Sequence, residues 1–289
     1  MTEWSVTEPV KLAPDGPVTR LRIRVVGGAV NVVGTDEGTA RVEVSEIEGP
    51  PLIVTQEGST LTVTYEDLHW KGILKWLDTK AHRRRAVVSV AVPAGAEVEV
   101  GAVMADTVVS GLRGRAEVRG VTGATTLVGL SGPVRAETVS GSLEAQSVTG
   151  ALRVSSVTGA VTVIEGSGSA VRAETVSGDL VLDLDPAPDG APPTDIRLAS
   201  VSGEIAIRLP HPADARVEAS TTSGSLSNGF EDLRVAGDWG TRSLTGTLGA
   251  GSGTLKATTV SGSIALLRRP ESAEDPEPTP TAPASGKVL

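Results

Sequence analysis

From residue 101 to residue 267, hydrophobic and polar residues alternate in short stretches that are separated by glycine-containing corners. The apolar residues fall at the second and fourth positions after each glycine, as at Leu143 and Ala145. A period of two is typical of a β-strand with one buried face. The residue between them, such as Arg135, Glu144 or Arg153, is expected to point outward, and the Val or Leu before each corner inward. The pattern therefore predicts three buried positions per unit.

The corners repeat with a period of nine residues, as the evenly spaced glycines from Gly123 to Gly168 show. A Val-Ser, Val-Thr or Leu-Ser pair precedes most of these glycines. Glycine adopts positive φ at little cost, and a neighbouring hydroxyl can bond the backbone of the turn. Nine glycines are therefore expected to be structural turns: Gly111, Gly123, Gly132, Gly141, Gly150, Gly159, Gly178, Gly203 and Gly262.

A unit of this length cannot form a core alone. Its strand of about four or five residues buries an apolar face only by stacking on neighbouring units. The sequence therefore predicts an all-β fold in which residues 101–267 form a single-stranded β-solenoid, or β-helix. Two units per coil, about 18 to 20 residues, is the preferred arrangement, and three units per coil is an alternative that the spacing leaves open.

The remaining segments suggest a cap, two interruptions and a tail. Residues 18–100 contain less regular strand candidates and are expected to form a β-rich cap over the first solenoid edge, with residues 1–17 as an N-terminal arm. Residues 182–198 and 227–243 interrupt the repeat. Residues 268–289 are rich in Pro and acidic side chains, which predicts a disordered tail. No cap is evident after Leu267.

The series of V-[ST]-G-x-[LVI]-x-[AVL] units, preceded by VSVAVPAG at 88–95, resembles the bacterial family of putative adhesins with β-strand repeats. The resemblance covers roughly residues 18–267. It implies a right-handed β-helix-like fold. The family is labelled largely as a domain of unknown function, so its motif is specific for the architecture and not for an activity.

The segment EDLHWKGILKWLDTKAHRRR, residues 66–85, differs from the rest of the chain. Its apolar residues follow helical spacing, and residues 69–85 sum to a charge of +5. Such a segment could cover a solenoid end, contact an anionic membrane surface as basic Trp-containing helices do, or dock a protein partner. The candidate contact residues are Trp70, Ile73, Leu74, Trp76, Leu77, Arg83, Arg84 and Arg85.

Composition excludes several classes of protein. The chain has no Cys, which excludes disulfides, thiolate zinc sites and cysteine nucleophiles. Its net charge of −9 disfavours nucleic-acid binding, which needs clustered cations. The chain shows neither a signal-peptide pattern nor a run of about 20 apolar residues, so we expect a cytoplasmic location, with membrane association as an alternative.

Side chains that could carry chemistry are scattered. Four acidic residues, Asp183, Asp185, Asp189 and Asp195, could attract Ca²⁺, but their spacing matches no calcium-binding loop. His69, His82 and His211 lack ligand spacing. A catalytic serine would need a nearby histidine, and His211 is the only one in the repeat region. We therefore expect no metal, no cofactor and no small-molecule substrate.

Two functional hypotheses remain. The first is a non-enzymatic β-solenoid scaffold, adhesin-like in its resemblance, that binds another protein or itself. The second is a peripheral membrane or cell-surface adhesion protein that contacts lipid through residues 66–85. Sparse aromatic residues disfavour carbohydrate binding in either case.

Overall fold

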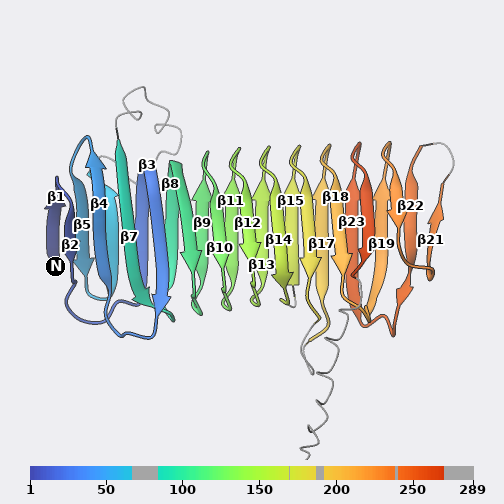
Figure 1. Ribbon diagram of the computed structural model, residues 1–289, viewed down its shortest axis with the longest axis horizontal. Helices are drawn as coiled ribbons and strands as arrows, with labels where there is room; N and C mark the ends of the chain where they lie inside the picture. The colour runs from blue at the N-terminus through green and yellow to red at the C-terminus, as the bar shows by residue number, and fades with distance from the viewer. Residues whose placement is uncertain (67–83, 169, 187–191, 238–239, 270–289) are drawn as a thin grey trace, which may run out of the picture.

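The computed structural model describes residues 1–66, 84–168, 170–186, 192–237 and 240–269, and every regular element in these ranges is a β-strand (Figure 1). The strands stack along one axis, so the molecule is a long β-solenoid. Two edges, at the top and bottom of Figure 1, carry the corners that join the strands.

The central repeat consists of two parallel sheets. Successive strands alternate between them, so β10 pairs with β12 and β11 pairs with β13. Sheet 1 holds β9 (Ala116–Gly120), β11 (Val134–Thr138), β13 (Leu152–Ser156), β15 (Ala170–Thr175) and β17 (Asp195–Ser200). Sheet 2 holds β10 (Thr125–Val128), β12 (Leu143–Gln146), β14 (Val161–Gly166), β16 (Leu180–Leu184) and β18 (Ile205–Leu209).

One coil of the solenoid contains two strands and two corners. Thr125 pairs with Leu143, eighteen positions further along the chain. Leu152 pairs with Val171, where one extra residue has been inserted. The predicted arrangement of two nine-residue units per coil is thus confirmed, and the three-unit alternative is wrong.

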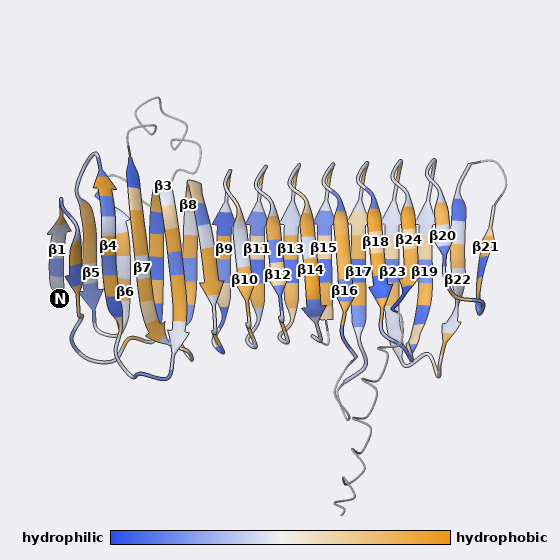
Figure 2. Cartoon of the chain, viewed as in Figure 1, coloured by the Kyte–Doolittle hydropathy of each residue, from blue (hydrophilic) through white to orange (hydrophobic). Residues whose placement is uncertain are grey.

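Aliphatic side chains from both sheets fill a single narrow core. The alternating bands along each strand in Figure 2 show the period of two that places one face inward. Equivalent positions stack from coil to coil, as Leu143, Val161 and Leu180 do in sheet 2. Burial of each such side chain stabilises the fold by about 1.5–3 kcal/mol.

Two long strands connect the repeat to the N-terminal cap. β3 (Arg20–Thr35) and β8 (Glu97–Ser110) each contribute to both sheets, and they pair along most of their length. Beyond β3 lie β6 (Thr60–Tyr65) and β7 (Arg85–Pro93), then β5 (Leu52–Glu57) and β4 (Arg41–Glu48), then β1 (Thr2–Val6) and β2 (Val10–Leu12). The last four strands pair antiparallel, so antiparallel strands cover the N-terminal end of the parallel stack.

The C-terminal coil lies inside the stack and not at its end. β23 (Gly253–Thr259) pairs with β17 on one side and with β19 (Ala215–Thr221) on the other. β24 (Ile264–Arg268) lies in the same way between β18 and β20 (Leu226–Asn228). Antiparallel β22 (Arg242–Leu248) and β21 (Leu233–Ala236) follow β19 and close this end. The expectation of an uncapped end after Leu267 is therefore wrong.

Candidate functional site

The two edges of the solenoid bury their corners differently. At corners that follow strands of sheet 2, the apolar residue turns inward, and Leu112, Leu130 and Val148 are at most 2% exposed. We call this the leucine edge. At five of the corners that follow strands of sheet 1, the valine points outward and is 43–49% exposed: Val139, Val157, Val176, Val201 and Val260. We call this the valine edge, and here the predicted third buried position is wrong. Val121, after β9, is an exception and packs partly against the core.

A buried hydroxyl explains why these valines face solvent. The residue before each valine turns inward and is at most 6% exposed: Thr138, Ser156, Thr175, Ser200 and Thr259. Its oxygen accepts a hydrogen bond from the N–H of the corner glycine, with N···O distances of 3.0 Å for Thr175 and Gly178 and 2.8 Å for Ser200 and Gly203. Because a buried N–H needs a partner, the hydroxyl occupies the inward position and the valine does not.

The corner glycines are required mainly because successive coils lie very close together. Only Gly111 and Gly123 of the nine predicted turn glycines have positive φ, so the conformational reason was wrong for the rest. At Gly141, a Cβ would overlap the carbonyl oxygen of Gly123, one coil earlier. The same overlap with an earlier corner would occur at Gly132, Gly150, Gly159, Gly178, Gly203 and Gly262.

The outward faces of the two sheets differ in charge. On sheet 1, strands β9, β11, β13, β15 and β17, together with Arg115 before β9, carry six arginines and four acidic side chains. On sheet 2, strands β10, β12, β14, β16 and β18 carry three acidic side chains and one arginine. The outward face of sheet 1 thus carries a net positive charge on these strands, although the whole chain has a net charge of −9.

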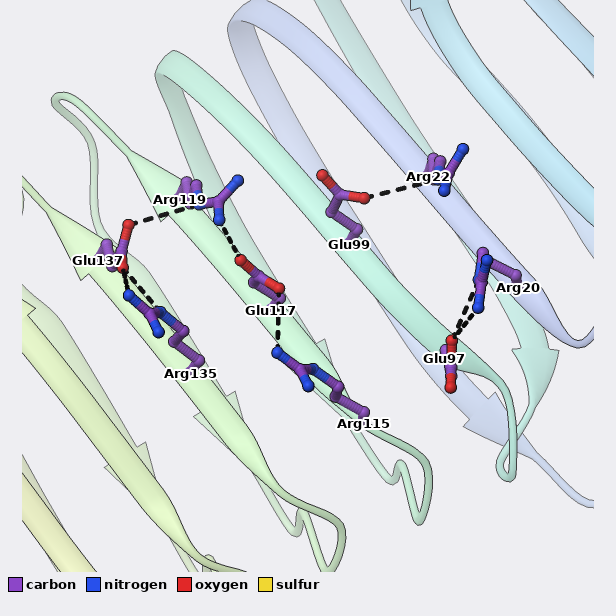
Figure 3. Close-up of polar contacts among 9 residues, drawn as sticks. All are labelled: Arg20, Arg22, Glu97, Glu99, Arg115, Glu117, Arg119, Arg135 and Glu137. Atoms are coloured by element: carbon purple, nitrogen blue, oxygen red, sulfur yellow. Dashed lines mark hydrogen bonds and ion pairs between the residues drawn. The ribbon is translucent and has the colours of Figure 1, made fainter. Parts of the chain in front are cut away.

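Near β3, the charges on sheet 1 alternate in sign and pair between side chains (Figure 3). Arg20 Nη2 lies 2.6 Å from Glu97 Oε2 on β8. Arg119 on β9 pairs with Glu117 and also with Glu137 on β11, where Nε and Oε2 are 3.4 Å apart. Opposite charges that face one another across strands stabilise a sheet. This part of the charged face therefore has a structural explanation.

Further along sheet 1, the charges no longer alternate. One outward position holds a cation on five consecutive strands of the stack, which we call the cationic row: Arg135, Arg153, Arg172, Arg197 and Lys256. Strands lie about 4.8 Å apart, so the row is about 20 Å long. Like charges directly opposite each other destabilise a sheet. Ion pairs with acidic neighbours offset this repulsion at four of the five cations, but not at Arg153 among the described residues. Stability of the fold therefore does not explain Arg153.

The arginines of the row are unequally neutralised. Arg135 donates to Glu137 (Nε···Oε1, 2.7 Å), and Arg172 donates to Glu174 at the same distance. Arg153 has Ser155 where its neighbours have glutamate, and among the described residues it makes no ion pair. The middle of the row therefore holds an uncompensated positive charge.

A shallow groove of about 300 Å³ runs beside the cationic row. Three small residues line the groove, each two positions before an arginine of the row: Pro133, Ala151 and Ala170. Arg115 lies at one end and Asp195 at the other. We call this the arginine groove, and none of the residues that line it is aromatic. Its shape and charge suit an extended anionic ligand.

Asp195 keeps its negative charge at the end of this groove. The hydroxyl of Thr254 donates to its carboxylate (2.7 Å), and Arg197 lies beside it. These contacts, the Thr254 hydrogen bond foremost, lower the pKa of Asp195 below its usual range. The groove therefore has a positive wall and one negative end.

Two of the acidic residues that could attract Ca²⁺ form ion pairs with arginines instead. Asp183 pairs with Arg208, whose hydrogen bond lowers the pKa of that carboxyl, and Asp185 pairs with Arg269. Asp189 lies outside the described residues. Within the ranges that the structure describes, no group of three or more potential ligands lies together. His69 and His82 are outside these ranges, and His211 Nε2 lies 2.8 Å from Arg268 Nη2.

The candidate contact residues between Trp70 and Arg83 also lie outside the described residues. Arg84 and Arg85 are described: the Arg84 guanidinium lies 5.7 Å from the centre of the Tyr65 ring, and Arg85 pairs with Glu46 at 3.7 Å. Arg85 is in register with Gly27, at the valine edge. In the described part of the chain, no helix is long and apolar enough to cross a membrane.

From the sequence, Arg135 and Arg153 are predicted only to face outward, and the row is not predicted. The signal is visible once alternate units are aligned, because a two-unit coil places every second unit on the same sheet. Five units then share one pattern, a cation followed four positions later by the exposed valine, as in Arg153 and Val157 or Lys256 and Val260.

Comparison with known proteins identifies the architecture. The family model described as Toastrack DUF4097 matches residues 18–267. No curated protein matches the chain. A solved structure described as a "putative cell adhesion protein" from Clostridium sporogenes is 12% identical, with a TM-score of 0.27, and the match covers 91% of this chain and 100% of that one. Another, described as a "putative lipid binding protein" from Parabacteroides distasonis, is 14% identical, with a TM-score of 0.40 and coverage of 90% and 97%. Likenesses at these TM-scores do not bear on function.

Proposed function

The chain belongs to the Toastrack family, a domain of unknown function, and we propose that it is a non-enzymatic scaffold that binds an anionic partner along the cationic row. A β-solenoid presents equivalent side chains at a regular spacing, which suits an extended partner. Fold alone does not determine activity, so the proposal rests on the surface.

The observation that carries the proposal is the register of five cations on an acidic protein. Arg153 has Arg135 and Arg172 directly opposite it on the two neighbouring strands. This arrangement opposes folding, whereas it concentrates positive potential where an anion can approach. Guanidinium groups also bind carboxylate or phosphate in a forked geometry.

The surroundings of the groove favour binding over catalysis. Of the residues that line it, only Asp195 could accept a proton at neutral pH, and its pKa is lowered. The corner serines of the valine edge donate to backbone carbonyls of the adjacent coil, as Ser140 does to Val121 (3.2 Å) and Ser177 to Val157 (3.3 Å). These hydroxyls have structural partners, so neither group supports a nucleophile and base.

Titration with fluorescent poly-L-glutamate tests the proposal. The variant R153A/R172A removes the centre of the row, and we expect its affinity to fall by about tenfold or more at low salt. The matched control is K11A/R41A, which changes the net charge equally but alters exposed residues of the N-terminal cap. Equal losses in both variants would contradict the proposal.

A second candidate function is contact with a membrane surface at the valine edge. The five exposed valines favour it, and so does Arg85, which places the end of the basic segment 66–85 at the same edge. Flotation with vesicles that contain anionic lipid tests this function. We expect V157S/V176S and W70A/W76A each to reduce the bound fraction. No flotation of the unmodified chain would exclude it.

A further inference from the structure

The last described residues leave the solenoid close to the arginine groove. β24 ends at Arg268, at the leucine edge, and the N–H of Arg269 donates to the carbonyl of Leu209 at the end of β18 (3.0 Å). The Arg269 side chain reaches further, to the carbonyl of Leu184 at the end of β16 (3.2 Å) and to Asp185. The chain therefore leaves β24 in the direction of the coils that form the groove.

The groove opens at the same edge. Ala170 and Asp195, which line it, are the first residues of β15 and β17, and the chain enters both strands from the side of the leucine edge. β24 is hydrogen bonded to β18, the strand that follows β17. The end of the described chain is therefore one coil, or about 5 Å along the axis, from the nearest end of the groove.

The sequence directly beyond Arg269 is acidic. Glu271, Glu274, Asp275 and Glu277 occur within eight residues of Arg269, and no basic residue follows until Lys287. An extended chain spans about 3.3–3.6 Å per residue, so these carboxylates can reach about 7–28 Å from Arg269. Along the solenoid axis, the cationic row extends from Lys256, in the same coil as β24, to Arg135, about 20 Å away. β24 belongs to sheet 2, and the two sheets lie about 10 Å apart. A segment of this length can therefore reach the middle of the row.

The chemistry of the groove also favours a peptide of this kind. Binding of sugars or nucleobases relies on aromatic platforms, and the lining has none. Small residues such as Ala151 leave room for a backbone, and the uncompensated Arg153 offers a forked partner for a carboxylate. A tethered segment also has an effective concentration of about millimolar, which favours it over free ligands.

We propose that residues 271–277 of this chain occupy the arginine groove and compete with its anionic partner. The inference rests on the proposed function, because it assigns a regulator to the same site. An external anion then binds only by displacing the acidic segment. Removal of the four carboxylates exposes the row.

The test uses the full chain with E271Q/E274Q/D275N/E277Q, titrated with fluorescent poly-L-glutamate at low salt. We expect affinity to rise by about tenfold, and the gain to disappear when R153A/R172A is added. The control E3Q/E8Q/D15N/E57Q removes the same charge from exposed residues of the cap that form no ion pair among the described residues, and we expect less than a twofold change. Equal affinities of the unmodified chain and the tail variant would overturn the inference. Absence of binding by every form would instead contradict the proposed function.

Cross-linking gives an independent readout. The chain has no cysteine, so A151C/S272C introduces the only pair. We expect it to oxidise to a disulfide several-fold faster than A206C/S272C, whose first residue lies on sheet 2. Similar rates for both pairs would also overturn the inference.

Discussion

The corners at the leucine edge and at the valine edge have nearly the same three-residue sequence. At the leucine edge the apolar residue of the corner is buried, whereas at the valine edge it is exposed. Leu130 fills the core at one edge, whereas Val157 faces solvent at the other and Ser156 turns inward. The difference lies in one hydroxyl that accepts a hydrogen bond from the corner glycine, 3.0 Å away in Gly159. Similar sequence at two corners therefore does not imply similar packing, because an unsatisfied buried N–H outweighs the gain from one more buried valine.

The largest effect that separates the edges is expected for Leu130→Ala. Leu130 is 1% exposed, so its truncation leaves a cavity and should lower the free energy of unfolding by about 2–5 kcal/mol. Val157→Ala is the matched control, with a loss of about 0.5 kcal/mol or less. Urea unfolding followed by circular dichroism measures both. Equal losses would mean that the two edges pack alike.

The next effect concerns the hydroxyl of the valine edge. Thr175→Val keeps the shape of the side chain but removes the acceptor for the Gly178 N–H, and we expect a loss of about 1–3 kcal/mol in the free energy of unfolding. Thr175→Ser keeps the acceptor, as Ser156 and Ser200 do in other coils, and should lose less than about 1 kcal/mol. If the valine variant is as stable as the serine variant, the hydroxyl does not determine which side chain of the corner faces inward.

Much of the repeat could be predicted from sequence, because period two and corner glycines are local signals. The nine-residue unit followed from them, and so did buried positions such as Leu143 and Ala145. The number of units per coil stayed open between two and three, because it depends on long-range pairing. The place of β23 could not be predicted, since its unit resembles every other unit and stacks next to β17 only through long-range pairing. The cationic row was hidden for a related reason: Arg153 and Arg172 become neighbours only once the coil length is known.

A smaller effect, of opposite sign, is expected on the face between the edges. Arg153→Thr removes one of the like charges in the cationic row, so it should raise the free energy of unfolding by about 0.2–1 kcal/mol at low salt. At 1 M salt, where the Debye length is about 3 Å, the gain should vanish. Glu144→Thr on sheet 2, which has Thr126 and Thr162 opposite it, is the control and should show neither the gain nor the salt dependence. A destabilised Arg153→Thr would show that the row supports the fold, and the aligned cations would then have a structural explanation.

The smallest effect is expected for Val157→Thr, and it tests whether the exposed valines serve the fold at all. The chain itself provides a precedent, because Thr222 occupies the corresponding corner next to β24 and its N–H donates to the carbonyl of Val260 (3.1 Å). A polar residue is thus compatible with this corner, and the free energy of unfolding should change by no more than about 0.5 kcal/mol. Unfolding at two protein concentrations extends the test. A loss above about 2 kcal/mol that grows with concentration would mean that the valine edge is buried between copies of the chain, and its exposure in a single copy would then mark an interface.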